Sequence, residues 1–396
     1  MQFKLSERIT KPDFQGEFTS SILKAGASKD IISFAGGLPN AISFPVKEMG
    51  EAVKKVLEEN GVAALQYSTT EGYEPLRAFI AKRYEKMGVN DVKASDIIIT
   101  NGSQQALDML SAVMLDPGDE IVVENPTYLA ALQSFHLYAP EVLPVELRTD
   151  GINCAELEKT LGEHSPKFMY IIPSFQNPTG LTYSPEVREK AAEIIKKTNM
   201  LLIEDNPYSE LRYRGDGGYS FGRYLGEQCC MLGTFSKVVS PGMRIGWICC
   251  RNEGLKAKLL AYKMTEDLHT NIFCQMVLAQ YLADNDLDAH IEETKKLYKA
   301  KAEHMIACME KYMPAGVEYT SPEGGMFMWA TMPEGLKAVD VYYAAIKKGV
   351  AVCPGDPFYE KDRNVRTMRI NYSNSSDENI EKGIRILGET IRELMA

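Results

Sequence analysis

Short apolar segments alternate with longer amphipathic segments along most of the chain. The apolar segments are rich in β-branched residues, as in "DIIIT" (96–100) and "EIVVE" (120–124). Continuous apolar runs of this length are typical of strands that are covered on both faces, as in a parallel sheet with helices on each side. We therefore expect an α/β fold with a mostly parallel sheet. Further strands are expected at 167–174, 200–205, 229–235 and 246–250.

Two of the amphipathic segments have clear helix boundaries. The segment 103–115 ends at the turn "DPGD" (116–119). The segment 184–198 begins with Ser184, a favourable N-cap, and continues with Pro185, which suits the first helical position. These signals predict helices in the connections between strands.

The pattern changes past about residue 285. Within 287–313, apolar residues such as Ile291, Tyr298 and Met305 recur at helical spacing, which predicts one long amphipathic helix. Mixed strand and helix patterns follow it. We therefore expect a large domain at 46–285, a smaller α+β domain at 286–396, and an N-terminal arm at 1–45 that packs on the smaller domain.

Composition and charge exclude several classes of function. The chain has 396 residues, a net charge of −10 and an isoelectric point near 5.3. Nucleic-acid binders usually present a basic face, so we expect no nucleic-acid partner. No apolar run approaches the roughly 20 residues that span a bilayer, and the first residues do not resemble a signal peptide. We expect a cytoplasmic protein with no membrane partner.

The cysteines and histidines do not follow the pattern of a metal site. The eight cysteines include the adjacent pairs Cys229–Cys230 and Cys249–Cys250, both within apolar segments. This spacing matches neither the CxxC pattern of zinc sites nor a disulfide framework. The five histidines are scattered. We expect buried thiols in a reducing compartment and no bound metal.

Polar residues that directly follow the expected strands are the candidates for chemistry, because α/β sheets bind ligands at their carboxyl ends. Gly102, Ser103 and Gln104 begin a helix whose free N–H groups suit a phosphate. The alternative is that Ser103 only caps this helix and binds no ligand. Tyr128 offers either a flat face for an aromatic ring or simple core packing.

Two further strand ends carry polar side chains. Asn177 in "FQNPTG" (175–180) is either part of a turn or a donor aimed at the same edge. Glu204 and Asp205 end an apolar strand, where an unpaired carboxylate is costly. Such a carboxylate either caps a turn or holds a cation or a protonated ring nitrogen, and Tyr208 lies within reach of the same place.

Lys237 is the least expected residue at these strand ends. It follows the strand at 229–235, beside Ser236 and seven residues before Arg244. A neighbouring cation and partial desolvation both lower a lysine's pKa, as a nucleophilic amine requires. Taken alone, Lys237 is better explained as a solvated lysine that happens to follow a strand.

One ligand uses all of these groups together. Pyridoxal 5′-phosphate has an aldehyde for the lysine and a ring nitrogen for the carboxylate, which keeps that nitrogen protonated so that the ring acts as an electron sink. The groups assigned to it are Ser103, Gln104, Ser236 and Arg244 for the phosphate, Tyr128 for the ring face, Asn177 and Tyr208 for the ring hydroxyl, Asp205 for the ring nitrogen and Lys237 for the aldehyde.

The order of the motifs adds a family resemblance. The series is "SFAGGLPN", "LQYSTTEGYEPLR", "TNGSQQALD", "ENPTY", "PSFQNPTG", "EDNPYSELRY", "TFSKVVSPGMRIGW" and "MRINYS". From about residue 30 onward it resembles a fold-type I, class I/II aminotransferase, and it is similar to the branch of 2-aminoadipate and kynurenine aminotransferases and MocR regulators. The resemblance implies the fold of the pyridoxal-phosphate-dependent transferases, with Lys237 as Schiff-base lysine and proton shuttle and the other groups in the roles above.

The resemblance also implies the substrate contacts and the assembly. Arg369 would grip the substrate α-carboxylate, with Gly37 and Asn177 beside the substrate. Tyr67 would reach the phosphate of the neighbouring subunit in a homodimer with shared active sites. The implied reaction is a ping-pong transfer of an amino group from an L-amino acid of the 2-aminoadipate, aromatic or aliphatic type to a 2-oxo acid, with 2-oxoglutarate the expected acceptor.

The sequence departs from this pattern near its start. In the resembling 2-aminoadipate enzymes an N-terminal helix often supplies an arginine for a distal carboxylate, but "FTSSILKAGASK" (18–29) has none, and Lys24 or Lys29 would have to substitute. A C–S β-lyase with the same cofactor is the main alternative. A MocR-like sensor is a second, but it would need a DNA-binding domain ahead of "SFAGGLPN", where about 30 residues stand.

Overall fold

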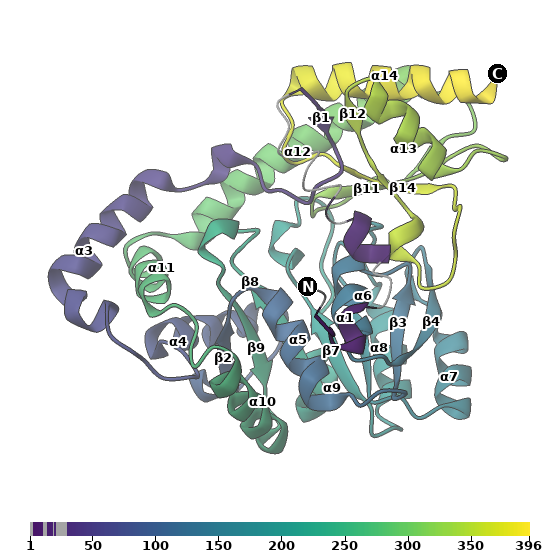
Figure 1. Cartoon of the computed structure of the whole chain (residues 1–396). Helices are drawn as coiled ribbons and strands as arrows, with labels where there is room; N and C mark the ends of the chain where they lie inside the picture. The colour runs from purple at the N-terminus through teal and green to yellow at the C-terminus, as the bar shows by residue number, and fades with distance from the viewer. Residues whose placement is uncertain (1–2, 11–13, 19, 21–29) are drawn as a thin grey trace.

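An eight-stranded sheet forms the centre of the larger part of the molecule (Figure 1). The computed structural model describes residues 3–10, 14–18, 20 and 30–396. In spatial order the strands are β2 (Ile97–Thr100), β9 (Gly246–Cys250), β8 (Cys229–Thr234), β7 (Leu201–Asp205), β6 (Phe168–Ile171), β3 (Glu120–Asn125), β4 (Glu141–Arg148) and β5 (Gly151–Ile152).

The sheet is mostly parallel, as the apolar runs predict. β8, β7, β6, β3 and β4 pair in parallel. β9 runs antiparallel to both of its neighbours, and β5 runs antiparallel to β4. The strands at 141–148 and 151–152 were not expected, because β4 lies toward the edge, has only two fully buried positions and contains Pro144.

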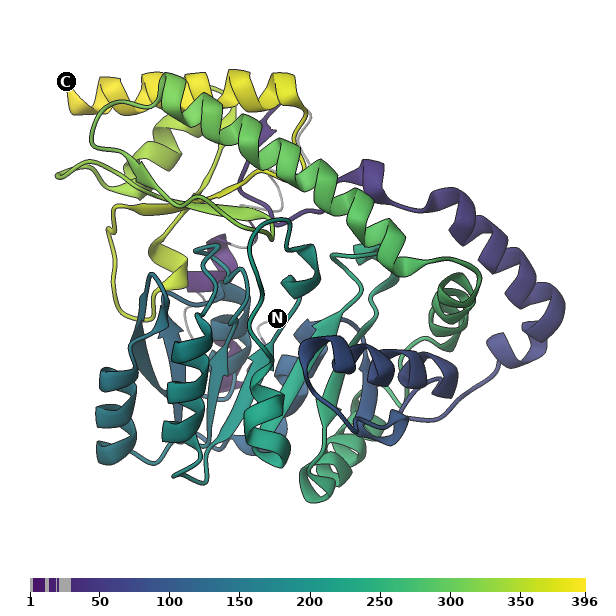
Figure 2. The ribbon, with the colours of Figure 1, turned by 180° about the vertical axis from the view of Figure 1, so that it is seen from behind.

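Helices cover both faces of this sheet (Figures 1 and 2). The helix with the expected Ser184 N-cap is confirmed, because the Ser184 hydroxyl accepts a hydrogen bond from the Val187 N–H at 3.2 Å. One face carries α5 (Ser103–Met114), α6 (Leu129–His136) and α10 (Glu253–Glu266), and the other carries α4 (Glu74–Arg83), α7 (Cys154–Glu163), α8 (Pro185–Ile195) and α9 (Phe221–Leu225).

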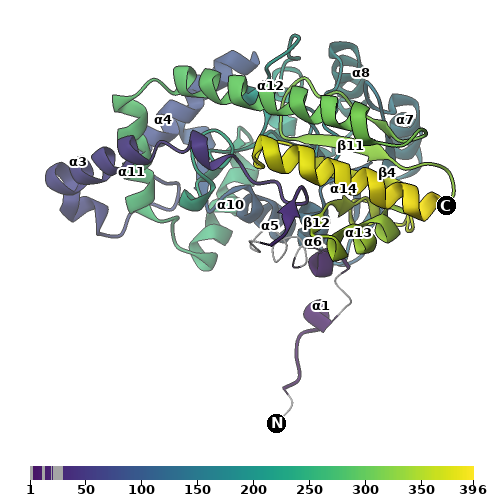
Figure 3. The same cartoon turned by 90° about the horizontal axis from the view of Figure 1, so that it is seen from above.

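A smaller unit follows the long helix that the periodicity predicts. Helix α12 (Leu287–Tyr312) buries Ile291, Tyr298 and Met305 as expected. Figure 3 shows it lying beside the C-terminal helix α14 (Asp377–Met395). The unit also contains β10 (Glu318–Tyr319), β11 (Phe327–Thr331), β14 (Thr367–Asn371) and β13 (Cys353–Pro354), which form one sheet in that order, and α13 (Ala338–Lys347).

The described part of the N-terminal region contacts the smaller unit. Strand β1 (Ile32–Ser33) pairs in parallel with β12 (Val350–Ala351). The Asn40 backbone N–H donates to the Tyr298 hydroxyl at 3.1 Å, and its side-chain amide donates to the Ser373 carbonyl at 2.8 Å. These contacts bring the "SFAGGLPN" segment between the two units.

Beyond this segment the chain leaves the smaller unit. Helix α3 (Val46–Ala64) runs out to pack on α11 (Ile272–Asp284) at the far side of the larger part (Figure 3). The short helix α1 (Glu7–Thr10) lies near the start. Among the described residues, no helix combines the length and the apolar character needed to cross a membrane.

The ends of β2, β9 and β8 are in register at the edge where the candidate residues lie. Gly246 is the partner of Thr100 on one side and of Thr234 on the other. A Cβ atom at Gly246 would lie 2.6 Å from the Gly102 carbonyl carbon and 2.7 Å from the Ser103 nitrogen. The start of α5 therefore approaches the sheet more closely than any side chain allows.

We predict that Gly246→Ala lowers the free energy of unfolding by about 2–4 kcal/mol, because backbone atoms of the α5 turn must move to admit the methyl group. The thermal midpoint of unfolding checks this. Gly162→Ala is the control: Gly162 lies in α7 with no atom within 4 Å of the added Cβ, so this variant should gain about 0.5–1 kcal/mol. Equal midpoints for the two variants would contradict the close approach.

Candidate active site

The start of α5 provides backbone N–H groups at the sheet edge. Gly102 precedes the helix with a φ of 76°, a conformation that glycine adopts readily, and Ser103 and Gln104 form its first turn. The first N–H groups of a helix have no partner within it and favour a negative charge. The Gln104 side chain, however, donates to the Ala130 carbonyl at 3.1 Å and the Ser134 hydroxyl at 2.7 Å, so its amide fastens α5 to α6.

Arg244 and Ser236 lie against the same turn. The Arg244 guanidinium occupies the space beside Gly102, where a Cβ would come within 2.4 Å of Nη2, and Nη2 donates to the Asn101 carbonyl at 3.2 Å. The Ser236 hydroxyl accepts from the Thr234 hydroxyl at 2.9 Å. The structure therefore brings a cation, a hydroxyl and a helix start together, which suits a phosphate group.

Glu204 and Asp205 point to opposite faces of the sheet, because successive strand residues alternate. Glu204 accepts from the Ser220 hydroxyl at 2.5 Å and the Phe221 N–H at 2.9 Å, and so caps the start of α9. Asp205 Oδ2 accepts from the Tyr170 hydroxyl at 2.9 Å. Of the two roles expected for a carboxylate here, Glu204 therefore has the capping role, and Asp205 faces the candidate site, where it could hold a cation or a protonated nitrogen.

The second oxygen of Asp205 has no partner. Oδ1 is buried and makes no hydrogen bond in the structure. Burial raises the pKa of this carboxyl to about 7, against the opposing effects of the Tyr170 hydrogen bond and the Lys237 charge. A buried oxygen without a donor is costly, and a protonated nitrogen of a ligand would remove that cost.

Lys237 lies among other cations at this edge. Its Nζ donates to the Gly37 carbonyl at 2.9 Å, which links the strand end to the "SFAGGLPN" segment. Burial, together with the charges of Arg369 and Arg244, lowers the pKa of the amine to about 8, and Asp205 opposes that shift. A larger fraction of this lysine is therefore neutral near pH 8 than of an ordinary lysine, as a nucleophile requires.

Arg369 is held rigidly on the side of the smaller unit. Its Nη1 and Nη2 donate at 2.6 Å each to Asn177 Oδ1 and to the Ala35 carbonyl, and its guanidinium lies over the rings of Phe327 and Phe358 at 4.4 and 5.0 Å. Its Nε is buried without a partner. The side chain is therefore pre-organised, and its Nε–H is available to an anion.

Tyr128 and Tyr208 complete the group of candidate residues. Burial raises the pKa of both phenols, so both hydroxyls stay protonated and can donate. The Tyr208 ring meets the edge of Phe327 at 5.8 Å. Besides burial, the charges of Asp205, Arg369 and Arg244 act on the pKa of Tyr128.

Two predictions concern other parts of the chain. Tyr67 stands apart from this group: it is 79% exposed, and its ring meets that of His269 edge-on at 6.0 Å. The segment 21–29, with Lys24 and Lys29, lies outside the described residues, so the structure does not place a substitute for the missing arginine.

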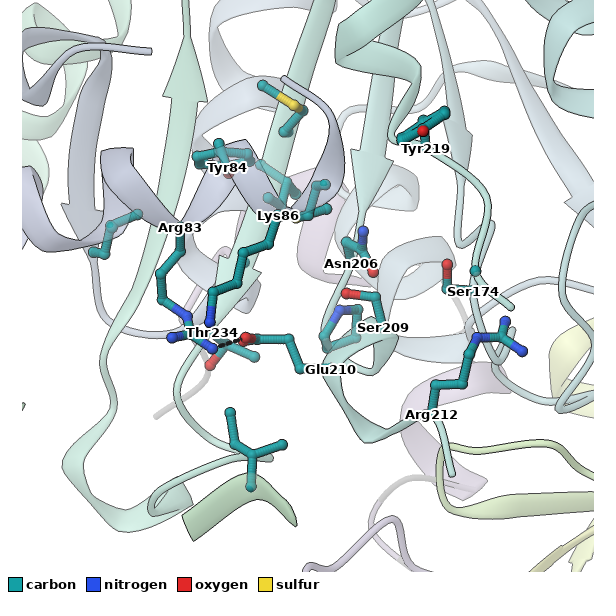
Figure 4. A pocket seen from close by; sticks show the side chains of 18 of the residues that line it. Arg83, Tyr84, Lys86, Ser174, Asn206, Ser209, Glu210, Arg212, Tyr219 and Thr234 are labelled. Carbon is teal, nitrogen blue, oxygen red and sulfur yellow. Dashed lines mark hydrogen bonds and ion pairs between the residues drawn. The ribbon is translucent and has the colours of Figure 1, made fainter. Parts of the chain in front are cut away.

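A separate cavity of about 570 Å³ lies between α4, the loop after β7 and the start of α12 (Figure 4). None of the candidate residues lines it. Arg83 forms ion pairs with Glu210 and, at 3.1 Å, with Asp288, and Lys86 also pairs with Asp288. The charges around this cavity therefore compensate one another within the protein.

The comparisons with known proteins agree with this geometry. The family model of aminotransferase class I and II matches residues 30–387. The chain belongs to the class I and II aminotransferases. Members of this family bind pyridoxal phosphate, and the expected fold-type I architecture and aminotransferase activity are confirmed.

Several relatives of this aminotransferase cover almost its whole length. It is 40% identical to aromatic-amino-acid aminotransferase 1 of Thermococcus litoralis, over 100% of this chain and 99% of that one. It is 38% identical to 2-aminoadipate transaminase of Thermus thermophilus, over 96% and 95%. The crystal structure of Pyrococcus horikoshii kynurenine aminotransferase in complex with PMP superposes with a TM-score of 0.93 at 39% identity, covering 100% and 98% of the chains. These relatives do not favour a C–S lyase or a regulatory sensor.

The sequence analysis missed several residues that shape the site of the aminotransferase. Tyr170 is hidden in the apolar segment 167–174, and the Ala35 carbonyl is a backbone group. Strand register would have identified Tyr170. It is the partner of Ile203, and Asp205, two residues after Ile203 on β7, points to the same face of the sheet.

We predict that the Lys237 amine of the cofactor-free aminotransferase titrates near pH 8, against about 10.4 for an unperturbed lysine. The amine reacts only when neutral, so the rate of its acylation against pH reports the midpoint. Arg369→Gln should raise the midpoint because it removes a positive charge, and Asp205→Asn should lower it. A midpoint near 10 in the unmodified protein, or shifts of the opposite sign, would contradict the electrostatics.

Proposed function

We propose that this aminotransferase moves the amino group of an L-amino acid to a 2-oxo acid with pyridoxal 5′-phosphate at the carboxyl edge of the large sheet, by a ping-pong mechanism. The observation that carries the proposal is the buried, unpartnered Oδ1 of Asp205 in the same group as the Lys237 amine. When bound, pyridoxal phosphate supplies an aldehyde that accepts amino groups and a protonated ring that withdraws electrons.

The residues present fit this cofactor. Asp205 would hold the protonated ring nitrogen, which supplies the missing partner of Oδ1. Tyr128 would cover the ring face, and Asn177 and Tyr208 would contact the ring oxygen. The phosphate would lie against Ser103, Gln104, Ser236 and Arg244, where the α5 turn leaves no room for a side chain on Gly246.

Lys237 carries the proton transfer. In the resting enzyme its Nζ would hold the aldehyde of the cofactor, and the amino group of the substrate would take its place there. Because its pKa is lowered to about 8, a substantial fraction of the freed amine is neutral near that pH and would be able to accept and carry the proton of the substrate Cα. Arg369 and Arg244 keep the amine from holding a proton too strongly.

Arg369 fixes the substrate. Its contacts with Asn177 and Ala35 hold the guanidinium in one orientation, and its Nε is the donor without a protein partner. The substrate α-carboxylate would bind here, beside Gly37, whose carbonyl receives the Lys237 amine in the structure. The amino group is thereby presented to the lysine end of the site.

The names of the relatives support amino acids with long side chains. Relatives at 38–40% identity are named for aromatic amino acids and 2-aminoadipate. We propose aromatic amino acids and 2-aminoadipate as the first donors to examine, aliphatic amino acids next, and 2-oxoglutarate as the acceptor. We also propose a cytoplasmic location, which the eight free cysteines support because they suit a reducing compartment.

A homodimer would complete the site. The stretch that ends α3 and follows it exposes three large apolar side chains: Val62, Leu65 and Tyr67 are 88%, 77% and 79% exposed. Large exposed apolar side chains that lie this close together in the chain are typical of an interface. We propose that a second copy of the chain covers this surface, and that the Tyr67 hydroxyl reaches the cofactor phosphate bound by that second copy.

We also propose a division of the chain into an N-terminal arm at 1–45, a large domain at 46–285 and a small domain at 286–396.

We predict that Lys237→Ala lowers the rate of amino transfer roughly a thousandfold or more, since it removes both the aldehyde anchor and the proton carrier. A half-reaction screen measures this: the enzyme is mixed with single amino acids, and the loss of the cofactor's visible absorbance is followed. Lys159→Ala, an exposed lysine in α7, is the control and should react normally. Full activity of Lys237→Ala would rule out the proposed function.

We predict that Tyr67→Phe weakens pyridoxal phosphate binding several-fold while the protein stays dimeric, because the phenylalanine keeps the apolar contact and loses the hydroxyl. Equilibrium titration and light scattering measure the two quantities. Dimers mixed from Lys237→Ala and Tyr67→Phe chains should contain one site with neither defect and bind there with normal affinity. The exposed Tyr343 on α13 gives the control variant Tyr343→Phe. A monomer, or an unchanged affinity, would contradict the shared site.

A further inference from the structure

Tyr170 is a buried phenol at the centre of the large sheet. It lies on β6, fully removed from solvent, and its hydroxyl donates to Asp205 Oδ2 at 2.9 Å. Its ring meets the edge of Phe135 on α6 at 5.5 Å. The ring is thus fixed from one side by aromatic packing, and the hydroxyl from the other by the carboxylate.

The hydrogen bond decides which oxygen of Asp205 is left for a ligand. A carboxylate in a cavity can rotate about its terminal bond and offer either oxygen. Here the Tyr170 hydroxyl occupies Oδ2, and Oδ1 stays buried without a donor. The same bond favours the ionised carboxylate, because a donor stabilises negative charge in a dry environment.

We propose that Tyr170 is a positioning residue for the cofactor: it holds Asp205 ionised with Oδ1 turned toward the ring nitrogen of pyridoxal phosphate. The inference rests on the proposed function, which places that nitrogen against Asp205. It assigns to Tyr170 no contact with substrate or cofactor, so its whole effect passes through Asp205.

The expected pH dependence follows from the groups around Asp205. The titratable groups whose charges couple to it are Lys237 beyond β8, Tyr170 on β6, Tyr128 after β3, Tyr208 in its own loop, Glu124 on β3, and Glu204, which points to the opposite face of the sheet. Among these, the Tyr170 hydroxyl is the side chain that donates a hydrogen bond to Asp205. Its removal raises the pKa of Asp205, so the carboxyl takes up a proton at higher pH, and a protonated carboxyl no longer pairs with a protonated ring nitrogen.

The chain offers a matched control. Tyr183 is also fully buried, and its hydroxyl donates at 2.8 Å to Oε1 of the buried Glu124. Glu124 also accepts from Gln176 and from the Ile172 N–H. Tyr183→Phe therefore removes a phenol-to-carboxylate hydrogen bond of the same kind in the same sheet, but at a carboxylate whose oxygens both have protein partners.

The test is equilibrium binding of pyridoxal phosphate to the full-length cofactor-free protein between pH 6 and 9, followed by its visible absorbance. Tyr170→Phe keeps the ring and should bind the cofactor roughly tenfold more weakly at pH 7. The pH below which the affinity decreases should be higher by about one unit than in the unmodified protein. Tyr183→Phe should follow the unmodified protein. The titration of free cofactor is common to all variants and cancels in the comparison.

A double-mutant cycle separates positioning from general loss of stability. Because Tyr170 acts through the carboxylate, Asp205→Asn and Asp205→Asn with Tyr170→Phe should bind the cofactor equally. The proposal is overturned if the two substitutions add, or if Tyr170→Phe matches Tyr183→Phe in affinity and pH profile. If Asp205→Asn itself binds and reacts normally, the proposed function fails and this inference with it, whereas a silent Tyr170→Phe beside an impaired Asp205→Asn overturns the inference alone.

Discussion

The carboxylate of Asp205, with one oxygen bonded to Tyr170 and the other without a donor, lies at the carboxyl end of the central, fully buried strand β7. Desolvation of Asp205 opposes its ionisation. Among the groups that favour the ionised form are the Tyr170 hydroxyl on β6 and the Lys237 amine just beyond β8, the two strands that flank β7. The parallel order β8-β7-β6 is what brings these three ends together. A ligand with a protonated nitrogen would donate to the unpartnered Oδ1 of Asp205, and an aldehyde on the same ligand would react with the Lys237 amine. The other candidate residues would surround that ligand.

The two structural units contribute to opposite ends of the site. In the proposed site the large sheet would provide the groups for the cofactor. Arg369 on β14 and the "SFAGGLPN" segment, which pairs with the smaller unit through β1, would provide the groups for the substrate. The contact from Lys237 Nζ to the Gly37 carbonyl and that from Arg369 to Asn177 join the two ends. Substrate selection can therefore vary in the smaller unit and the N-terminal segment without changes to the chemistry.

Much of this arrangement could be predicted from the sequence, for a physical reason. Strands covered on both faces are continuous apolar runs, so the polar residue that ends each run is conspicuous, and Lys237 and Asp205 were found in this way. Strand β4 was missed because an edge strand lacks the continuous run. Tyr170 was missed because a buried tyrosine in an apolar run looks like packing, and only strand register shows that it faces Asp205. Strand alternation predicts that Glu204 and Asp205 point to opposite faces of the sheet. Only the fold shows which of the two carboxylates caps α9 and which faces the site.

The most direct measurement is to locate the covalent attachment. Borohydride treatment of the purified protein reduces a lysine that is joined to pyridoxal phosphate, and mass spectrometry of the proteolytic peptides then identifies that lysine. The account predicts a single modified peptide that carries the reduced adduct on Lys237. An adduct on a different lysine, such as the buried Lys263 that is paired with Asp267, or a protein that takes up no adduct after incubation with the cofactor, would contradict it.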